Sequence, residues 1–401
     1  MLELCRSNYP IHRLAPIGGA GAARGIEHSD SEPVRFRATS QRWLIGYRRG
    51  RRCGPCRLKF RWVRILRIMV TRRNVLLSLP ALAAATRLKA QSAKPQIAVR
   101  SLSHMTLTVS DRKRSLEFYQ GLFGLPVQHR QGVSIGLRIG SGPQYISLAQ
   151  GGSNAKAAIA HFCMTIDNFN ADRITNILAG HGVTKGEPGP LKMWVRMRGP
   201  DAGGAREGTP EFYLGDPDGI AVQLQDVSYC GGAGVLGNVC QPPEPAPAKG
   251  LLALRDLSHF TLSVSNGQRS TSFYQELFNM PVQVHQGAAA LLAVGSHRQF
   301  VTMGGGNATG MPNIAHGCFT MDGFNPDKVL KILADYGIKP RGDARGPAPP
   351  LVSYVSMRME NRGGAKGGTP ELYFTDPDGI LMQIQDSTYC GGAGYLGEVC
   401  S

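Results

Sequence analysis

Two histidines recur at the same spacing in two distant parts of the chain. His104 and His259 are 155 residues apart, and so are His161 and His316. Each lies in a stretch of alternating polar and apolar residues, which is typical of a strand with one buried face. A lone strand histidine is more often structural than a ligand. A recurring pair on polar strand faces instead predicts a site for a divalent metal, because imidazole nitrogen is a common metal ligand.

The polar faces of three predicted strands would position the ligands. Side chains alternate across a strand, so residues two apart share a face. In the first copy, the polar faces carry His104 with Thr106, His161 with Cys163, and Gln223 with Gln225. The second copy repeats this set with His259, His316 and Gln383.

An internal repeat organises residues 101–401. The segment 103–110 returns as 258–265, and 23 of the 33 positions in 208–240 are identical in 368–400. The copies meet at the proline-rich segment 241–250, which predicts a semi-rigid linker. We therefore expect one domain over 100–240 and a second over 251–401.

Each copy contains the same pattern of elements twice, a strand and a helix followed by further strands. Two expected helices interrupt a series of strands, which indicates an α+β fold class. In the first copy we expect helices at 111–123 and 170–181, and strands at 103–110, 133–139, 144–149, 160–166, 193–198, 210–215 and 220–226.

The opening and closing motifs of each copy resemble the vicinal-oxygen-chelate superfamily, which includes glyoxalases, bleomycin-resistance proteins and extradiol dioxygenases. The opening motif is His104-x-x-Leu107-x-Val109-x-Asp111-x-x-x-Ser115-x-x-Phe118-Tyr119. The closing motif is Asp-Pro-Asp-Gly at 216–219 and 376–379, followed by Gln223 and Gln383. The resemblance implies two tandem domains, each built of two βαβββ units that form a half-open mixed-sheet barrel around one cleft.

In that family a divalent metal in the cleft is chelated by two oxygens of the substrate. The resemblance implies that His104, His161 and Gln223 hold one ion, and that His259, His316 and Gln383 hold another. Two histidines and a carboxylate form the usual facial site for Fe(II). The family most often supplies glutamate where this chain has glutamine, which can coordinate but is neutral. Iron, manganese, nickel and zinc therefore stay open, as does a degenerate site that holds no metal.

Two tyrosines are candidate catalytic residues. Tyr213 and Tyr373 each lie ten residues before the predicted glutamine ligand. This spacing resembles the extradiol enzymes, in which a tyrosine bonds the substrate near the metal; the alternative is an aromatic residue of the core. The acid–base histidine of those enzymes has no clear match. Arg206 and Lys366 occupy that region, where they would either neutralise an anionic substrate or remain solvated loop charges.

Two functions follow from the resemblance and remain open. The first is a metal-dependent enzyme, either a dioxygenase or an isomerase or lyase of the glyoxalase type, acting on a small-molecule substrate. The second is a non-catalytic small-molecule-binding protein of the bleomycin-resistance type. Glutamine in place of glutamate and the missing acid–base histidine favour the second.

The positive charge of the chain is confined to its first hundred residues. The formal net charge is +17, and residues 1–100 hold 21 of the 45 Lys and Arg but only four of the 28 Asp and Glu. The remainder is electrically balanced. A nucleic-acid-binding domain needs its basic residues on the folded surface, so we expect no nucleic-acid partner.

Residues 69–93 resemble a secretory signal of the twin-arginine type. Arg72 and Arg73 precede a short apolar run and a small-residue cleavage site, and the run is too short to span a bilayer. We expect the export machinery as a partner, no stable membrane anchor, and a periplasmic or extracellular location. Because a signal belongs at the N-terminus, we expect Met69 to be the true start and 1–68 to be a mistranslated or disordered extension.

Two cysteine pairs close glycine-rich segments at equivalent places in the copies. Six cysteines follow the predicted signal, and six permit 15 pairings. Glycine-rich chain can bend back and bring its ends together, and an exported protein meets oxidising conditions. We therefore predict the disulfides Cys230–Cys240 and Cys390–Cys400. Cys163 and Cys318 are expected to be buried structural cysteines beside the histidines.

Overall fold

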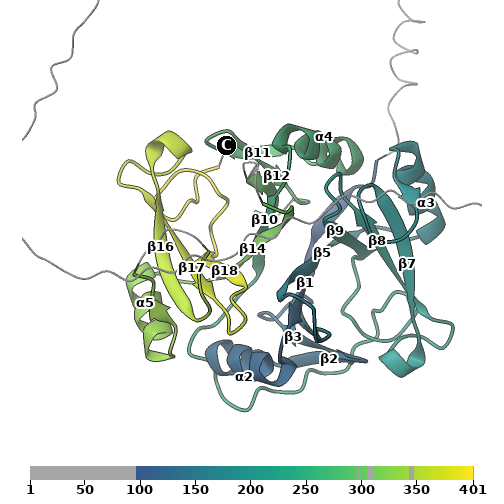
Figure 1. The fold of residues 1–401 in the computed structure, drawn as a ribbon, viewed down its shortest axis with the longest axis horizontal. Helices are drawn as coiled ribbons and strands as arrows, with labels where there is room; N and C mark the ends of the chain where they lie inside the picture. Colours follow the sequence, from purple (N-terminus) through teal and green to yellow (C-terminus); the bar gives the residue numbers. More distant parts are fainter. Residues whose placement is uncertain (1–95, 297, 305–309, 343–346, 401) are drawn as a thin grey trace, which may run out of the picture. The chain divides into compact units, whose positions relative to one another are not determined.

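The structure is a computed structural model, and it describes residues 96–296, 298–304, 310–342 and 347–400 (Figure 1). The described residues all belong to one compact unit. The predicted extension 1–68 and signal 69–93, with Arg72 and Arg73, lie outside the described residues. Within the described part of the chain, we find no helix with the length and apolar character needed to cross a membrane.

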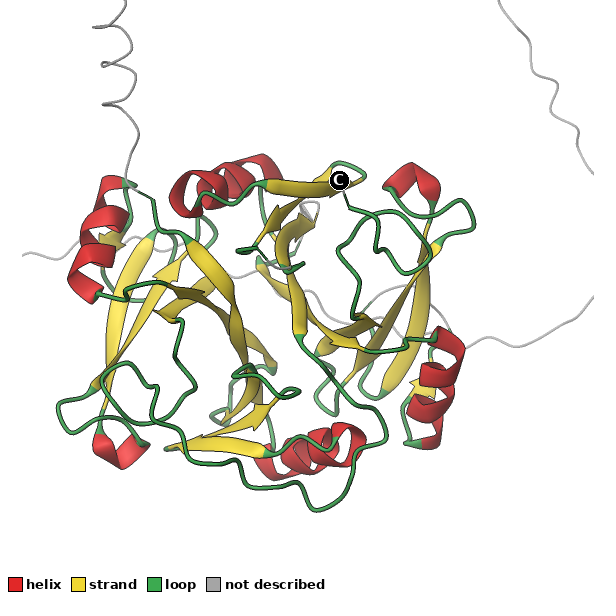
Figure 2. Cartoon of the chain, turned by 180° about the vertical axis from the view of Figure 1, so that it is seen from behind, coloured by secondary structure: helices red, strands yellow, loops and turns green. Residues whose placement is uncertain are grey.

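Two nine-stranded mixed sheets form the fold, one from each copy. The strands curve into two barrel-like halves with the helices at the outside (Figure 2). The first copy contains β1 (Val99–Val109), α2 (Arg112–Phe123), β2 (Val127–Gln131), β3 (Ser134–Arg138), β4 (Tyr145–Gln150), β5 (Ala158–Ile166), α3 (Ala171–Gly180), β6 (Thr184–Lys185), β7 (Lys192–Arg198), the 3-10 turn η1 (Pro200–Ala202), β8 (Thr209–Gly215) and β9 (Ala221–Asp226).

The second copy repeats the same order of elements. It contains β10 (Leu257–Ser263), α4 (Gly267–Phe278), β11 (Val282–Gln286), β12 (Ala289–Ala293), β13 (Phe300–Gly304), β14 (Asn313–Met321), α5 (Pro326–Asp335), β15 (Lys339–Pro340), β16 (Val352–Arg358), η2 (Glu360–Arg362), β17 (Thr369–Thr375) and β18 (Leu381–Asp386). The predicted α+β fold with two tandem domains is confirmed.

The centre of each sheet brings the two βαβββ units of one copy together. In the first sheet the strand order is β2-β3-β4-β1-β5-β9-β8-β7-β6, so β1 and β5 are neighbours at the seam between the units. β1 runs parallel to β4 and antiparallel to β5, and β5 runs parallel to β9. The strands that carry the candidate ligands are therefore adjacent. The sequence missed β2, because Val127 is its only strongly apolar residue.

Helix α2 begins and ends where its sequence dictates. The Asp111 side chain accepts a hydrogen bond from the Arg114 backbone N–H, which caps the first turn. Gly124 then adopts a left-handed conformation with φ of 65° and closes the last turn. The residues buried against the sheet recur at helical spacing; they are Ser115, Phe118, Tyr119, Leu122 and Phe123.

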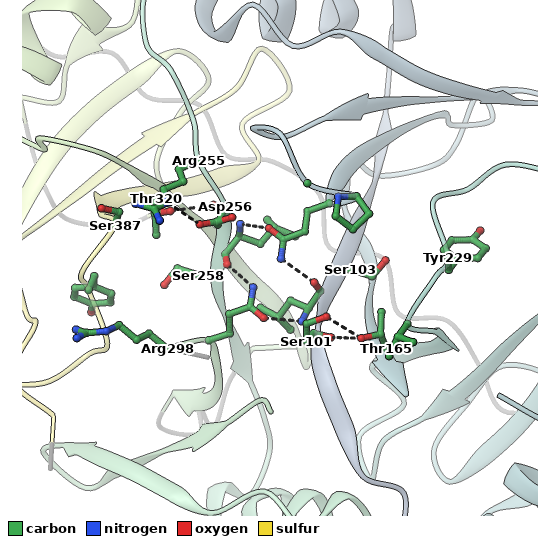
Figure 3. A pocket seen from close by; sticks show the side chains of 18 residues that line it. Ser101, Ser103, Thr165, Tyr229, Arg255, Asp256, Ser258, Arg298, Thr320 and Ser387 are labelled. Atoms are coloured by element: carbon green, nitrogen blue, oxygen red, sulfur yellow. Dashed lines mark hydrogen bonds and ion pairs between the residues drawn. The ribbon is translucent and has the colours of Figure 1, made fainter. Parts of the chain in front are cut away.

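The two copies pack on each other through their central strands. The rings of Phe162 on β5 and Phe260 on β10 stack with centroids 4.9 Å apart. Gln144 and Gln299 cross between the copies, and each bonds the backbone of both Leu102 and Leu257 at 2.8 Å. Beside these amides lies a polar cavity of about 450 Å³ between the copies (Figure 3).

The Asp-Pro-Asp-Gly turns also join the two copies. The buried Asp216 accepts hydrogen bonds from the backbone of Ile220 at 2.9 Å and from the Tyr274 hydroxyl of the other copy at 3.4 Å. Asp218, two residues on, pairs with Arg269 and Ser265. The equivalent turn of the second copy makes the same contacts with the first, through Tyr119 and Arg114. The motif therefore holds the tandem arrangement together.

We predict that Asp216→Asn stabilises the protein at pH 8 and has little effect at pH 5. Burial raises the pKa of Asp216 from 3.8 to about 6. A raised folded-state pKa stabilises the fold below the unfolded-state pKa, and this contribution is lost as the pH rises through 6. Asparagine keeps the acceptor oxygen and carries no charge, so we expect a gain of about 1–2 kcal/mol at pH 8. Urea unfolding at the two pH values measures it.

The adjacent carboxylate provides a control of opposite sign. Although burial acts to raise the pKa of Asp218, the hydrogen bonds from Ser265 and Arg269 lower it overall. Asp218→Asn should therefore destabilise the protein at pH 8. An equal loss of stability from both variants would contradict the assignment of the turn's two carboxylates to opposite roles.

Candidate functional site

The predicted ligands lie in two adjacent rows that cross neighbouring strands. On the first sheet, His104 on β1 is opposite Cys163 on β5, and Cys163 is opposite Gln223 on β9. Tyr213 on β8 is in turn opposite Gln223. His161 lies in the adjacent row, opposite Thr106 on β1. The second sheet has the same register for His259, Cys318, Gln383, Tyr373 and His316.

Short distances join the candidate ligands in both copies. His104 Nε2 lies 2.9 Å from Gln223 Oε1, and His259 Nε2 lies 3.1 Å from Gln383 Oε1. The two imidazole rings of each copy have centroids 5.6 Å apart in the first and 5.5 Å apart in the second. The structure therefore brings together all six residues that the sequence predicted as metal ligands.

The histidines of both clefts are neutral at physiological pH. Burial lowers the pKa of His161 and of His316 to about 4. Burial, with the neighbouring imidazole second, also holds the pKa of His104 and His259 well below 6.5. Metal ligation requires the neutral imidazole, so these side chains need not lose a proton before they bind an ion.

The second cleft contains buried polar atoms that lack a partner among the described residues. They are His316 Nε2 and Gln383 Nε2. A buried polar atom without a partner costs free energy, so such atoms are available to bind a ligand or a water molecule. Two imidazole nitrogens and an amide oxygen fit a divalent metal. The described part of the chain has no cluster of three or more His, Cys, Asp or Glu residues that would hold one instead.

A serine contacts the Nδ1 atom of each first-strand histidine. Ser103 Oγ lies 3.1 Å from His104 Nδ1, and Ser258 Oγ lies 3.1 Å from His259 Nδ1. An amide oxygen can only accept, so the contact with Gln223 needs the proton on Nε2. Ligation through Nε2 needs the proton on Nδ1 instead. A hydroxyl serves both states because it can donate or accept.

The predicted catalytic tyrosines contact a buried carboxylate that the sequence analysis missed. The hydroxyl of Tyr213 donates to Glu211 at 3.4 Å, and that of Tyr373 donates to Glu371 at 3.3 Å. Burial first, and the carboxylate second, raises the pKa of both tyrosines well above 10. Each tyrosine thus stays protonated and can act as a hydrogen-bond donor.

Each buried glutamate is neutralised by a fully buried arginine. Arg198 Nε donates to Glu211 at 2.8 Å, and Arg358 Nε donates to Glu371 at 2.7 Å. The side chains of both arginines are 0% exposed. Glu211 and Arg198 recur in the second copy at the offset of 160 residues, which is the signal that could have found them. Arg206 and Lys366, which the sequence analysis considered instead, are exposed in their loops.

A disulfide-closed loop follows a tyrosine that contacts the first-strand histidine in each copy. The predicted pairs Cys230–Cys240 and Cys390–Cys400 are both formed, with Cα atoms 6.3 Å apart. The residue before each loop, Tyr229 or Tyr389, lies against the first-strand histidine with ring centroids 5.8 and 5.7 Å apart. Cys163 and Cys318 are free and buried, as predicted, and burial raises the pKa of both thiols well above 9.

The cleft of the second copy is a cavity of about 790 Å³. The candidate ligands His259, His316 and Gln383 line it together with Tyr373 and Tyr389. Its outer part is formed by α4, by the hairpin between β11 and β12, and by Arg362. This volume suits a small organic molecule.

Comparison with known proteins finds a family model that matches the first copy. Residues 101–224 match the Glyoxalase/Bleomycin resistance protein/Dioxygenase superfamily. The match includes His104, His161 and Gln223, the candidate ligands of the first copy. No curated protein matches the sequence.

Several solved structures resemble the chain. A catechol 2,3-dioxygenase is 15% identical with a TM-score of 0.50, covering 75% of this chain and 89% of that one. Homoprotocatechuate 2,3-dioxygenase from Arthrobacter globiformis is 19% identical with a TM-score of 0.47, covering 73% and 81%. The Mn(II)-bound glyoxalase from Novosphingobium aromaticivorans is 14% identical with a TM-score of 0.46, covering 72% and 82%. At 15% identity, the likeness to the catechol 2,3-dioxygenase shows the fold alone.

Proposed function

We propose that each copy of this vicinal-oxygen-chelate protein binds a divalent metal, and that the protein acts on a small molecule chelated through two oxygens. His104, His161 and Gln223 would hold one ion, and His259, His316 and Gln383 the other. The observation that carries the proposal is the second-copy triad, in which neutral imidazoles and an amide oxygen converge with His316 Nε2 left unpartnered among the described residues.

A bound metal would supply a Lewis acid and a template for the two substrate oxygens. The chain's own residues would do the rest. Tyr373 would donate a hydrogen bond to the ligand from its position opposite Gln383. Ser258 would accept a hydrogen bond from His259 Nδ1 when His259 binds the ion through Nε2. Tyr389 and its disulfide loop would close one end of the cleft and limit the access of water.

Non-catalytic binding is the second candidate function. The glutamine ligand is neutral, and Tyr373 is a poor general base because burial holds its pKa well above 10. The carboxylate of Glu371 is already paired with Arg358. Metal content separates the candidates in part, because a sequestering protein of this kind needs no metal.

The compartment forms a further part of the proposal. Two disulfides are typical of an oxidising environment, where glutathione does not keep thiols reduced. We therefore propose export to the periplasm or cell exterior through the twin-arginine-like segment 69–93.

We predict two equivalents of metal per purified chain, measured by elemental mass spectrometry on protein without tag histidines. His316→Ala should leave one equivalent, because it removes one donor from the second cleft only. His285→Ala is the matched control, since His285 is exposed on β11, and should leave two. Gln383→Glu should bind the second ion at least about tenfold more tightly, because a carboxylate offsets more of the charge.

Circular dichroism would confirm that each variant folds. A metal-free protein that stays empty after reconstitution with Fe(II), Mn(II), Ni(II) and Zn(II) would refute the metal site and leave the binding protein as the better conclusion. Two equivalents that persist in His316→Ala would place the metal elsewhere.

A further inference from the structure

The two clefts have diverged at the positions that form their outer part. In the second copy these positions carry small side chains, on the first half of α4 and on the hairpin between β11 and β12. The repeat gives the equivalent positions in the first copy by subtraction of 155. Gly267, Thr271, Ser272, Ala288 and Ala290 of the second cleft correspond to Arg112, Leu116, Glu117, Val133 and Ile135 of the first.

Two of the larger residues of the first copy, Arg112 and Ile135, occupy the space, whereas Glu117 and Val133 are exposed. Ile135 is buried, with only 7% of its surface exposed. Arg112 reaches from the start of α2 to the backbone carbonyl of Val133 and donates a hydrogen bond to it. Because both equivalent positions, Gly267 and Ala288, line the second cavity, this contact spans the mouth of the first cleft.

The second cleft also has a charge that the first lacks. Among the described residues that line it, Arg362 and Glu371 are the charged ones, and Glu371 is paired with the buried Arg358. Arg362 lies on η2 at the cleft mouth, and no carboxylate of the described residues pairs with it. The first copy has Ala202 at this position. An unpaired guanidinium at the mouth of a cavity favours an anionic ligand.

We propose that the second cleft alone admits an organic ligand, that this ligand is a small anion, and that Arg362 pairs with its carboxylate. The first cleft keeps the ligand triad but is closed by Arg112 and Ile135. This assignment rests on the proposed function for the way in which the ligand is held at the inner end of the cleft. The inference adds that the second copy is the one that binds the organic ligand, and that the outer end of its cleft recognises a carboxylate.

The test is calorimetric titration of the metal-loaded chain with two probes that share a chelating diol. They are 3,4-dihydroxybenzoate and the neutral 3,4-dihydroxybenzamide. We expect one benzoate per chain although two metals are bound. Arg362→Ala should weaken benzoate binding about tenfold and change benzamide binding less than about twofold. Lys366→Ala is the matched control, because Lys366 is an exposed cation of the next loop that does not line the cavity.

Exchange of residues between the copies tests the assignment to one cleft. Gly267→Arg with Ala290→Ile should abolish benzoate binding while the protein keeps two metals. Arg112→Gly with Ile135→Ala should open the first cleft and raise the number of benzamide molecules bound toward two. Both pairs introduce residues that the fold already holds at the equivalent position, and circular dichroism checks that each variant folds.

The outcomes separate this inference from the proposed function. Two metals with two benzoates per chain, or one benzoate that survives Gly267→Arg with Ala290→Ile, would overturn the inference and leave the proposed function intact. A chain without metal would overturn the proposed function. One-site binding of benzoate that depends on Arg362 would still support the inference in that case, and failure of both probes to bind would overturn it.

Discussion

Replacement of Arg358 by methionine should lower the free energy of unfolding by about 3–5 kcal/mol, because it leaves the charge of Glu371 buried without its cation. Both side chains are almost fully enclosed, at 0% and 7% exposed. The guanidinium also donates to the carbonyl of Gly363 at 2.7 Å and to that of Gly392 at 2.9 Å. The variant therefore also loses the link between β16 and the disulfide loop. Urea unfolding at pH 7.5 measures the loss.

Two further variants show whether the buried charge is the cause. Adding Glu371→Gln to Arg358→Met removes the unpaired charge and should recover part of the lost stability. Lys331→Ala breaks the exposed pair with Asp335, whose side chains are 76% and 63% exposed, and should cost less than about 1 kcal/mol. If Arg358→Met cost no more than Lys331→Ala, the ion pair would not be a main support of the cleft.

This ion pair also marks the limit of the sequence analysis. Strand alternation placed His104, His161 and Gln223 on polar faces, and the register of β1, β5 and β9 brings those faces together. Strand alternation predicts on which face of the sheet a side chain lies, but it does not predict which residue that side chain contacts. The pairing of Arg198 with Glu211 could therefore not be predicted from the pattern. Both residues recur in the second copy at an offset of 160 residues. Glu211 lies outside the family motif, however, and it was not among the predicted site residues.

The sequence predicted the two disulfides in full, but it did not predict the contacts of the two interdomain turns. The glycine-rich spacing predicted Cys230–Cys240 and Cys390–Cys400 because such a segment can bend back and bring its ends together, and both disulfides are formed. The Asp-Pro-Asp-Gly motif entered the sequence analysis only as part of the closing motif of the family. Its bonds to Tyr119 and Arg114 of the other copy depend on how the sheets pack, and no local pattern contains that information. Divergence of the clefts likewise needed the structure, which showed that Arg112 contacts Val133.

Replacing two residues of the first copy, His129 and Gly136, by their equivalents in the second copy should make the protein markedly more resistant to unfolding by acid. His129 on β2 has two buried ring nitrogens without a hydrogen-bond partner among the described residues; the Cys230 backbone lies close but forms no regular hydrogen bond. Burial, and the charge of Arg198 second, lowers the pKa of His129 from 6.5 to about 3. A depressed folded-state pKa gives stability that is present above pH 6.5 and is lost as the pH falls toward 3.

The second copy fills the equivalent space with apolar side chains. His129 and Gly136 correspond to Val284 and Leu291, and a side chain at Gly136 would overlap the His129 ring. Leu291 packs in the second copy against Phe300 and Tyr389. His129→Val with Gly136→Leu therefore exchanges an imidazole that resists protonation for an apolar pair that already fits the fold.

We expect this double variant to gain about 2 kcal/mol over the parent between pH 7.5 and pH 5, because each pKa unit is worth about 1.4 kcal/mol. Urea unfolding across that pH range measures the gain as a smaller loss of stability between pH 7.5 and pH 5 than the parent shows. An equal change in stability at every pH would not support the prediction. Gly136→Leu alone should destabilise at all pH values, since His129 still fills the space. A double variant with the parent's pH dependence would show that His129 titrates normally, and the acid sensitivity would then lie with the histidines of the two clefts.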